Sequence, residues 1–231
     1  MTSPGDLISA PDYALAFRML QPMPEPPRRL LALLHGVGGQ ELQLASLGAR
    51  VDKGTLVVLP RAPRSIANGM YGWFRVGFTA DGPEIVPEEA EESRLRLIEF
   101  IGQLQQHHEV APSHTVVAGF SQGGIMSASV ALSTPESVAG FGLLCGRILP
   151  ELEPALAPRN QLATLDALIV HGRADDKLPL AWAERADAWL QRLGVPHELR
   201  LHDAGHEFTP TMQADVLQWF GSARQRWQCE P

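Results

Sequence analysis

The sequence predicts an α/β fold with a mainly parallel central sheet and helices on both faces of that sheet. Two observations support this prediction. Short, almost wholly apolar runs alternate along the chain with longer segments of helical periodicity. Solidly apolar runs are typical of strands that are buried on both faces, and strands that alternate with helices are typical of parallel sheets. With 231 residues and no internal repeat, the chain fits one domain over residues 1–231.

In the first part of the chain the expected elements are short and separated by proline-rich stretches. Residues 21–27 contain four prolines, so they form neither a regular helix nor a central strand. We expect a loose leader at 1–9, an edge strand at 13–20, buried strands at 30–34 and 55–59, and a helix at 41–50. Residues 61–86 are expected to form a long loop, and loops of this length are usually functional.

In the second part of the chain helices and strands are longer. The helix expected at 87–106 has acidic residues in its first turns, where the helix dipole favours them, so we do not interpret this run as a metal site. Further strands are expected at 138–144, 167–171 and 198–201, with helices at 180–193 and from Pro210 onward, the latter capped by Thr209. Residues 149–165 are expected to be irregular.

Composition and charge exclude several classes of partner. The formal net charge is -7 and no basic cluster offsets it, which argues against nucleic acid and anionic membranes as partners. The two cysteines, Cys145 and Cys229, do not suggest a disulfide framework. No signal peptide is visible, and no apolar run is long enough to span a membrane. We therefore expect a cytoplasmic protein, and the sequence leaves a homodimer open.

The centre of the sequence is a strand-to-helix turn around Ser121. A β-branched apolar run from Thr115 ends at about Ala118, and Gly119-Phe120-Ser121-Gln122-Gly123 then leads into a small, apolar helical segment. Glycines at 119 and 123 allow a sharp turn where a Cβ atom would crowd the crossing chain. This Gly-x-Ser-x-Gly context predicts a nucleophile elbow, in which Ser121 lies at the apex with its hydroxyl exposed.

An acid and a histidine follow later strands and predict the partners of this serine. Asp175 comes just after the strand at 167–171, and His206 lies just after the last strand. In parallel sheets the active site lies beyond the carboxyl ends of the strands. The order Ser121, Asp175, His206 is the order found in α/β-hydrolases. Asp176 stays an alternative acid, although we prefer Asp175.

The roles of these residues follow from proton transfer. His206 would take the proton of Ser121 as the serine attacks a carbonyl carbon, and Asp175 would hold the imidazole in the right tautomer. The backbone N–H groups of Gln122 and Val37 are the candidate donors to the oxyanion.

The remaining titratable residues are interpreted as structural. His35 and His171 are expected to brace loops near the site, and Cys145 to be a small buried apolar residue. A metal site at His202 and His206 is disfavoured, since the sequence has neither a His-Glu-x-x-His motif nor a cysteine pair. We therefore expect no cofactor and no metal.

Several stretches, taken jointly and in order, make the chain resemble the phospholipase/carboxylesterase family, which includes acyl-protein thioesterases and small bacterial carboxylesterases. The matching stretches, spread from about residue 30 to 210, are Leu34-His35-Gly36-Val37-Gly38, Pro60-Arg61-Ala62-Pro63, Trp73-Phe74, Gly119-Phe120-Ser121-Gln122-Gly123-Gly124, His171-Gly172-Arg173-Ala174-Asp175 and Gly205-His206. The resemblance implies an α/β-hydrolase with little or no lid, a Ser121/Asp175/His206 triad, and hydrolysis of short to medium acyl esters or thioesters.

One departure from the family pattern falls in the long loop. Family members often carry Trp-Phe-Asp, whereas this chain has Arg75 after Trp73 and Phe74. We expect the segment from Met70 to Phe78 to line the acyl side of the cleft, with Trp73 and Phe74 contacting substrate, although both could belong to the core. Esterase, acyl-protein thioesterase or lysophospholipase, and a non-catalytic protein that binds a small molecule all stay open, the esterase being preferred.

Overall fold

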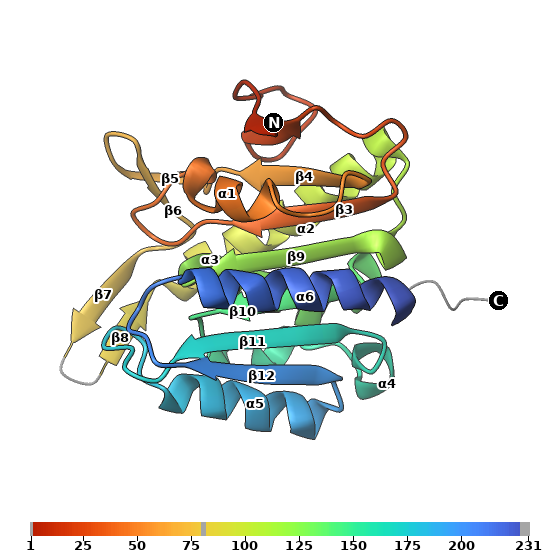
Figure 1. Cartoon of the computed structure of the whole chain (residues 1–231). Coiled ribbons are helices and arrows are strands. Elements are labelled where there is room, and N and C mark those ends of the chain that lie inside the picture. The colour runs from red at the N-terminus through yellow and green to blue at the C-terminus, as the bar shows by residue number, and fades with distance from the viewer. Residues whose placement is uncertain (1, 80–81, 227–231) are drawn as a thin grey trace.

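The computed structural model of the chain describes residues 2–79 and 82–226 and is built on one eight-stranded sheet (Figure 1). Its strands, in spatial order, are β1 (Ser3–Pro4), β2 (Phe17–Gln21), β4 (Thr55–Pro60), β3 (Arg29–Leu34), β9 (Thr115–Phe120), β10 (Gly140–Leu144), β11 (Asp166–Gly172) and β12 (His197–His202). All pairs from β4 to β12 are parallel, whereas β1 with β2 and β2 with β4 pair antiparallel at one edge of the sheet. The predicted mainly parallel sheet is confirmed.

Helices cover both faces of the sheet because its central strands are apolar on both sides. In β9 the side chain of Val117 belongs to one hydrophobic cluster, while Val116 and Ala118 belong to the other. The first cluster lies under α2 (Pro87–His108), α3 (Gln122–Ser133) and α5 (Ala181–Leu193). The second lies under α1 (Ala45–Gly48) and α6 (Pro210–Arg226), which are in front of the sheet in Figure 1. None of the helices in the described part of the chain is long and apolar enough to cross a membrane.

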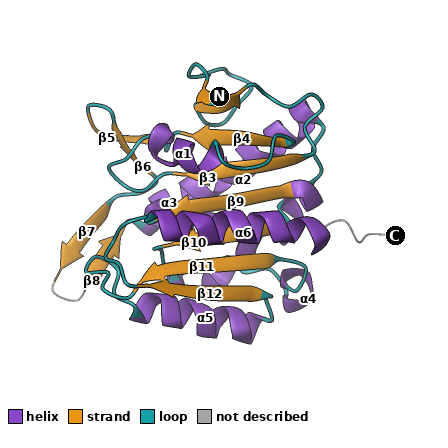
Figure 2. Ribbon diagram, in the orientation of Figure 1, coloured by secondary structure: helices purple, strands orange, loops and turns teal. Residues whose placement is uncertain are grey.

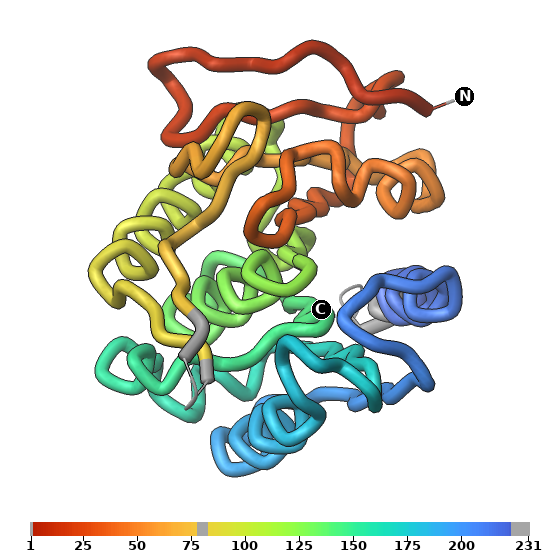
Figure 3. The backbone as a smooth tube through the Cα atoms, turned by 90° about the vertical axis from the view of Figure 1, so that its left-hand side faces the viewer, coloured from red at the N-terminus to blue at the C-terminus, as the bar shows by residue number. Residues whose placement is uncertain are grey.

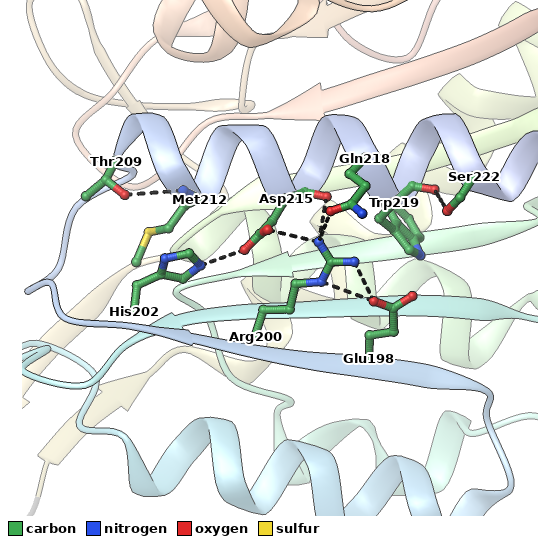
Figure 4. Close-up of polar contacts among 9 residues, drawn as sticks. All are labelled: Glu198, Arg200, His202, Thr209, Met212, Asp215, Gln218, Trp219 and Ser222. Atoms are coloured by element: carbon green, nitrogen blue, oxygen red, sulfur yellow. Dashed lines mark hydrogen bonds and ion pairs between the residues drawn. The ribbon is translucent and has the colours of Figure 1, made fainter.

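A polar network fastens α6 to the outermost strand. Figure 4 shows Arg200 and His202 reaching from β12 to Asp215 on α6, with Arg200 Nη1 at 2.9 Å from Asp215 Oδ1 and His202 Nε2 at 2.7 Å from Asp215 Oδ2. Glu198 holds the other side of the guanidinium at 2.6 Å. The loop that carries His206 joins these two elements, so the network fixes both ends of that loop.

The segment at residues 61–86, which we expected to be a loop without regular structure, forms two β-hairpins (Figure 2). They pair β5 (Arg64–Ala67) with β6 (Met70–Gly72), and β7 (Val76–Thr79) with β8 (Gly82–Ile85). The first hairpin turns at Asn68-Gly69, where Gly69 has a φ of 73°. Asn-Gly between two short strands is a strong hairpin signal, so this hairpin was predictable from the sequence.

Three further expectations differ from the structure in detail. Residues 3–4 are not a loose leader, because β1 pairs with β2 and the N–H of Gly5 donates to the carbonyl of Met19 at 2.9 Å. The helix expected at 41–50 is a 3₁₀ turn at Glu41–Leu44 followed by the short α1. The region at 149–165 contains a 3₁₀ segment, Pro150–Ala155, and the short α4 (Arg159–Leu162).

Candidate active site

Ser121 lies between the end of β9 and the start of α3, at the sharp turn that the sequence predicts. Its backbone has φ 54° and ψ -117°, a conformation that non-glycine residues rarely adopt and that occurs at functional sites. A Cβ atom on Gly119 would lie 2.3 Å from the carbonyl carbon of Gly123, and one on Gly123 would lie 2.2 Å from the carbonyl oxygen of Leu34. Both predicted glycine requirements are confirmed, because strand and helix cross too closely for a side chain.

The structure brings Ser121, His206 and Asp175 into one hydrogen-bonded line. His206 Nε2 is 2.9 Å from Ser121 Oγ, and His206 Nδ1 is 2.7 Å from Asp175 Oδ2. Because a carboxylate can only accept, Nδ1 carries the imidazole proton and Nε2 is free to accept the serine proton. The ring of His206 also packs beside Phe120 at a centroid distance of 5.1 Å.

Asp175 is fixed by the loop that it closes. Its Oδ1 accepts the backbone N–H groups of Lys177 and Leu178 at 2.9 and 2.8 Å, so that only Oδ2 faces His206. The alternative acid, Asp176, has a side chain that is 75% exposed and lies near Lys177 instead. The side chain of Asp175 is fully buried, so the arrangement favours Asp175 over Asp176.

The two histidines expected to brace loops are buried and do so. His35 Nδ1 donates to the carbonyl of Gly36 and its Nε2 accepts the N–H of Ala62, which ties the end of β3 to the chain after β4. His171 Nε2 donates to the carbonyl of Leu178, within the loop of Asp175. Burial lowers the pKa of both histidines, which keeps them neutral beside the acid and the serine.

The two candidate oxyanion donors lie on the same cavity as Ser121. Among the hydrogen bonds of the described residues, none uses the backbone N–H of Val37 or of Gln122. The neighbouring N–H groups of Gly36 and Gly38 are occupied, by Gln43 Oε1 at 2.7 Å and by the carbonyl of Tyr71 at 2.9 Å. These two N–H groups beside the serine hydroxyl donate to no acceptor among the described residues, so both are available to donate to a ligand oxygen.

The cavity in front of Ser121 has a volume of about 290 Å³ and is mostly apolar. We call it the Ser121 cavity; it is lined by Gly36, Val37, Phe74, Val76, Pro83, Ile85, Phe120, Ser121, Gln122, Ile125, Arg147, Lys177, Leu178 and His206. It lies at the carboxyl edge of the sheet, which faces the viewer in Figure 3. A wider groove of about 780 Å³ adjoins it along the two hairpins and contains Arg64, Arg75, Glu84 and Glu89.

Trp73 and Phe74, both of which we expected to contact substrate, differ in their position relative to the Ser121 cavity. Trp73 has no exposed surface and does not line the cavity; its indole Nε1 donates to the carbonyl of His35 at 2.9 Å. Phe74 forms part of the cavity wall. For Trp73 the alternative that it belongs to the core is the one that fits, because its indole fills the space behind His35.

The side chain of Gln122 holds this wall in place. Its Oε1 accepts the backbone N–H of Trp73 at 2.7 Å, and its Nε2 donates to the carbonyl of Phe74 at 2.7 Å. Arg75, where relatives often carry aspartate, turns away to Glu89, with Nε at 2.6 Å from Oε1. Arg75 therefore lies along the wider groove and not on the Ser121 cavity.

Within the described residues no cluster of His, Cys, Asp and Glu could hold a metal ion. His202 is bonded to Asp215, as Figure 4 shows, and His206 faces Ser121, so the two histidines do not act as a pair. Cys145 is buried, and burial raises the pKa of its thiol to about 12, which agrees with the prediction of an unreactive residue.

Arg147, which was not among the predicted site residues, lines the Ser121 cavity with only 6% of its surface exposed. Its position in the sequence could have indicated a site residue. Arg147 comes just after the apolar run of β10, and the carboxyl ends of parallel strands meet at the edge of the sheet where active sites lie.

Comparisons with known proteins find similar sequences and structures. The sequence profile of the Phospholipase/Carboxylesterase family matches residues 18–221. The chain is 28% identical over 151 residues to acyl-protein thioesterase 1 of Emericella nidulans, which covers 60% of this chain and 63% of that protein. It is 25% identical over 180 residues to acyl-protein thioesterase 1 of Kluyveromyces lactis, covering 73% and 78%. The chain thus spans less than two thirds of the first of these relatives.

A carboxylesterase structure from Mesorhizobium loti has the same fold. The two structures superpose with a TM-score of 0.79 over 94% of this chain and 99% of the other, at 23% sequence identity.

Proposed function

Because the chain belongs to the phospholipase/carboxylesterase family, we propose that it is a serine hydrolase that cleaves carboxylic esters with short to medium acyl chains. The observation that carries this proposal is the line from Ser121 Oγ to His206 and Asp175, with separations of 2.9 and 2.7 Å, at the wall of a mostly apolar cavity. Three side chains with complementary proton roles in one line are what nucleophilic catalysis by a serine requires.

In the proposed acylation step, Ser121 Oγ attacks the ester carbonyl carbon while His206 Nε2 takes the hydroxyl proton. Asp175 Oδ2 holds the Nδ1 proton and stabilises the positive imidazolium that forms. The carbonyl oxygen becomes an oxyanion, and the N–H groups of Val37 and Gln122 donate to it. His206 then returns the proton to the departing alkoxide, so that the alcohol leaves and an acyl ester remains on Ser121.

In the proposed deacylation step, water repeats the same sequence. His206 takes a proton from the water molecule as its oxygen attacks the acyl carbon, and the proton then goes to Ser121 Oγ as that bond breaks. The products are a carboxylic acid and the free enzyme, with no net change at any side chain. Every proton in both steps passes through His206 Nε2.

The size and lining of the cavity favour short to medium acyl groups. A volume of about 290 Å³ is at the lower end of the range of about 300–1,000 Å³ that is usual for small-molecule sites. The adjoining groove carries two arginines and two glutamates, Arg64, Arg75, Glu84 and Glu89, and would solvate a long apolar tail poorly.

A second candidate is a thioesterase or lysophospholipase activity in the same site, which the similarity to two acyl-protein thioesterases favours. The two activities are distinguished by comparing kcat/KM for p-nitrophenyl esters of two to sixteen carbons with that for S-acyl peptides of the same lengths. An optimum at long thioesters would favour the second candidate.

The central test uses the Ser121→Ala variant. It should fold normally and lose turnover by at least about three orders of magnitude, because the nucleophile is gone. A fluorophosphonate probe should label the unaltered enzyme at Ser121 and not the variant, which also separates catalysis from mere binding. EDTA should leave the rate unchanged. If the purified variant kept more than a few per cent of the rate, or if EDTA abolished activity and a divalent ion restored it, the proposal would be wrong.

A further inference from the structure

Arg147 is a buried cation on the Ser121 cavity without an acidic partner. Its guanidinium lies over the ring of Trp182, 4.6 Å from the centroid, and Nη2 makes one long hydrogen bond of 3.4 Å to the carbonyl of Pro83. No carboxylate among the described residues forms an ion pair with it. The carbonyl of Pro83 belongs to the β7–β8 hairpin, which in Figure 3 lies beside the chain that leaves β10.

The other buried arginines of the described chain are neutralised. Arg29 pairs with Asp52, and Arg94 pairs with Glu91 at 2.6 Å. A buried charge without a partner is costly, because the charge loses its water and gains no opposite charge. Burial accordingly lowers the pKa of Arg147, with the charge of Glu151 opposing this only in part. Arginine nevertheless keeps its charge at neutral pH, so the cavity contains a cation with free N–H donors.

The rest of the cavity adds positive charge and no negative charge. Lys177 is the second cation on the lining, and no aspartate or glutamate is among the lining residues. The Nζ atom of Lys177 lies 3.5 Å from Asp176, and its side chain is 59% exposed, so it is a peripheral charge. A positive, otherwise apolar cavity is unexpected in a chain of net charge -7, and it selects for an anionic ligand.

We propose that Arg147 binds a carboxylate of the substrate, so that the preferred substrates are esters that bear a free carboxylate besides the scissile bond. A guanidinium matches a carboxylate through two parallel hydrogen bonds, and such charge-assisted pairs are strong where water is excluded. The inference rests on the proposed function, since it concerns the substrate of the same serine. The carboxylate can belong to the acyl group, as in a monoester of a dicarboxylic acid, or to the alcohol.

The test compares two matched pairs of esters. For the acyl side, 4-nitrophenyl hemiglutarate is compared with 4-nitrophenyl pentanoate, and for the alcohol side, 3-carboxyphenyl butyrate is compared with phenyl butyrate. In Arg147→Met the anionic-to-neutral ratio of kcat/KM should fall about tenfold to a hundredfold in at least one pair, the size expected for a lost charge-assisted hydrogen bond. Arg147→Lys, which keeps the charge, should restore part of the ratio.

Arg185→Met is the matched control. Arg185 also stacks on Trp182, at 4.8 Å from the ring centroid, but it is exposed and does not line the cavity. This control removes the same charge beside the same ring, and both ratios should stay at the unaltered values. If both ratios were unchanged in Arg147→Met while neutral esters were hydrolysed, the inference would be refuted and the esterase would stand.

A binding measurement keeps the inference testable if hydrolysis fails. Calorimetry compares glutaramate, which bears one carboxylate besides a neutral amide carbonyl, with pentanamide, which bears none. Arg147→Met should bind glutaramate at least tenfold more weakly than the unaltered protein does, with a smaller change for pentanamide. Equal weakening for the anionic and the neutral ligand, or no weakening, would refute the role of Arg147. Absence of both neutral-ester hydrolysis and fluorophosphonate labelling would refute the proposed function and with it the ester substrates, whereas the binding result would still decide whether Arg147 binds a carboxylate.

Discussion

The substitution Asp175→Asn should abolish activity while leaving the fold intact, for a reason that the loop geometry supplies. Oδ1 of Asp175 accepts two backbone N–H groups, at 2.9 and 2.8 Å. In the asparagine variant the amide oxygen must take this place, because an NH₂ group there would face two donors in a buried site. The NH₂ group is then directed at His206 Nδ1, where Oδ2 was at 2.7 Å.

This orientation reverses the tautomer of His206. Nδ1 becomes an acceptor, so the ring proton moves to Nε2, and Nε2 can no longer take the proton of Ser121. The expected loss in kcat is about four orders of magnitude, the size known for a triad whose acid is replaced in this way. The two backbone hydrogen bonds survive, so the free energy of unfolding should change by only about 1 kcal/mol.

The assay is hydrolysis of p-nitrophenyl butyrate, with urea denaturation as the measure of stability. Asp176→Asn is the control, since its side chain is 75% exposed and should alter kcat by less than about twofold. A larger loss for Asp176→Asn than for Asp175→Asn, or an Asp175→Asn enzyme with more than a tenth of the original rate, would refute the reasoning.

Three other predictions concern the scaffold. Gly123→Ala should lower the free energy of unfolding by at least about 3 kcal/mol, since its Cβ would lie 2.2 Å from the carbonyl oxygen of Leu34; a urea midpoint equal to that of the parent would contradict the close crossing. Phe74→Ala should shift the optimum acyl length among p-nitrophenyl esters, whereas Trp73→Phe should lower the melting temperature without moving that optimum, because only Phe74 lines the cavity. Burial alone would raise the pKa of Glu41, but hydrogen bonds from two arginines outweigh it and lower the pKa to about 2. The stability that this carboxylate contributes is therefore present above pH 4.5 and lost as pH falls toward 2, and Glu41→Gln should flatten that part of the curve of unfolding free energy against pH.

The strand-ending residues were predictable because the sequence carries a strong local signal at each of them. The apolar run of β9 followed by two glycines leaves little choice of conformation around Ser121, and His206 follows the last strand in the same way. The rule that parallel strands share their carboxyl edge then brings these residues together without any knowledge of side-chain contacts.

What the sequence did not predict depends on contacts between distant segments. The burial of Trp73 follows from a hydrogen bond to the carbonyl of His35, 38 residues away. The pairing of Glu41 with Arg18 and Arg61 likewise joins three separate parts of the chain. The place of Arg147 just after β10 can be read from the sequence, but that no carboxylate of the described residues pairs with it is visible only once the neighbouring side chains are in place.

The Gln122 side chain makes two hydrogen bonds to the backbone of Trp73 and Phe74. The side chain of residue 122 therefore has a role separate from that of its backbone N–H. The backbone N–H of residue 122 does not depend on the amide side chain, so replacing Gln122 by another residue with a backbone N–H leaves the proposed oxyanion donor intact. Such a replacement removes the two hydrogen bonds that hold the cavity wall at Phe74 in place. The width of the cavity can therefore be altered through residue 122 while Ser121, Asp175 and His206 are left unchanged.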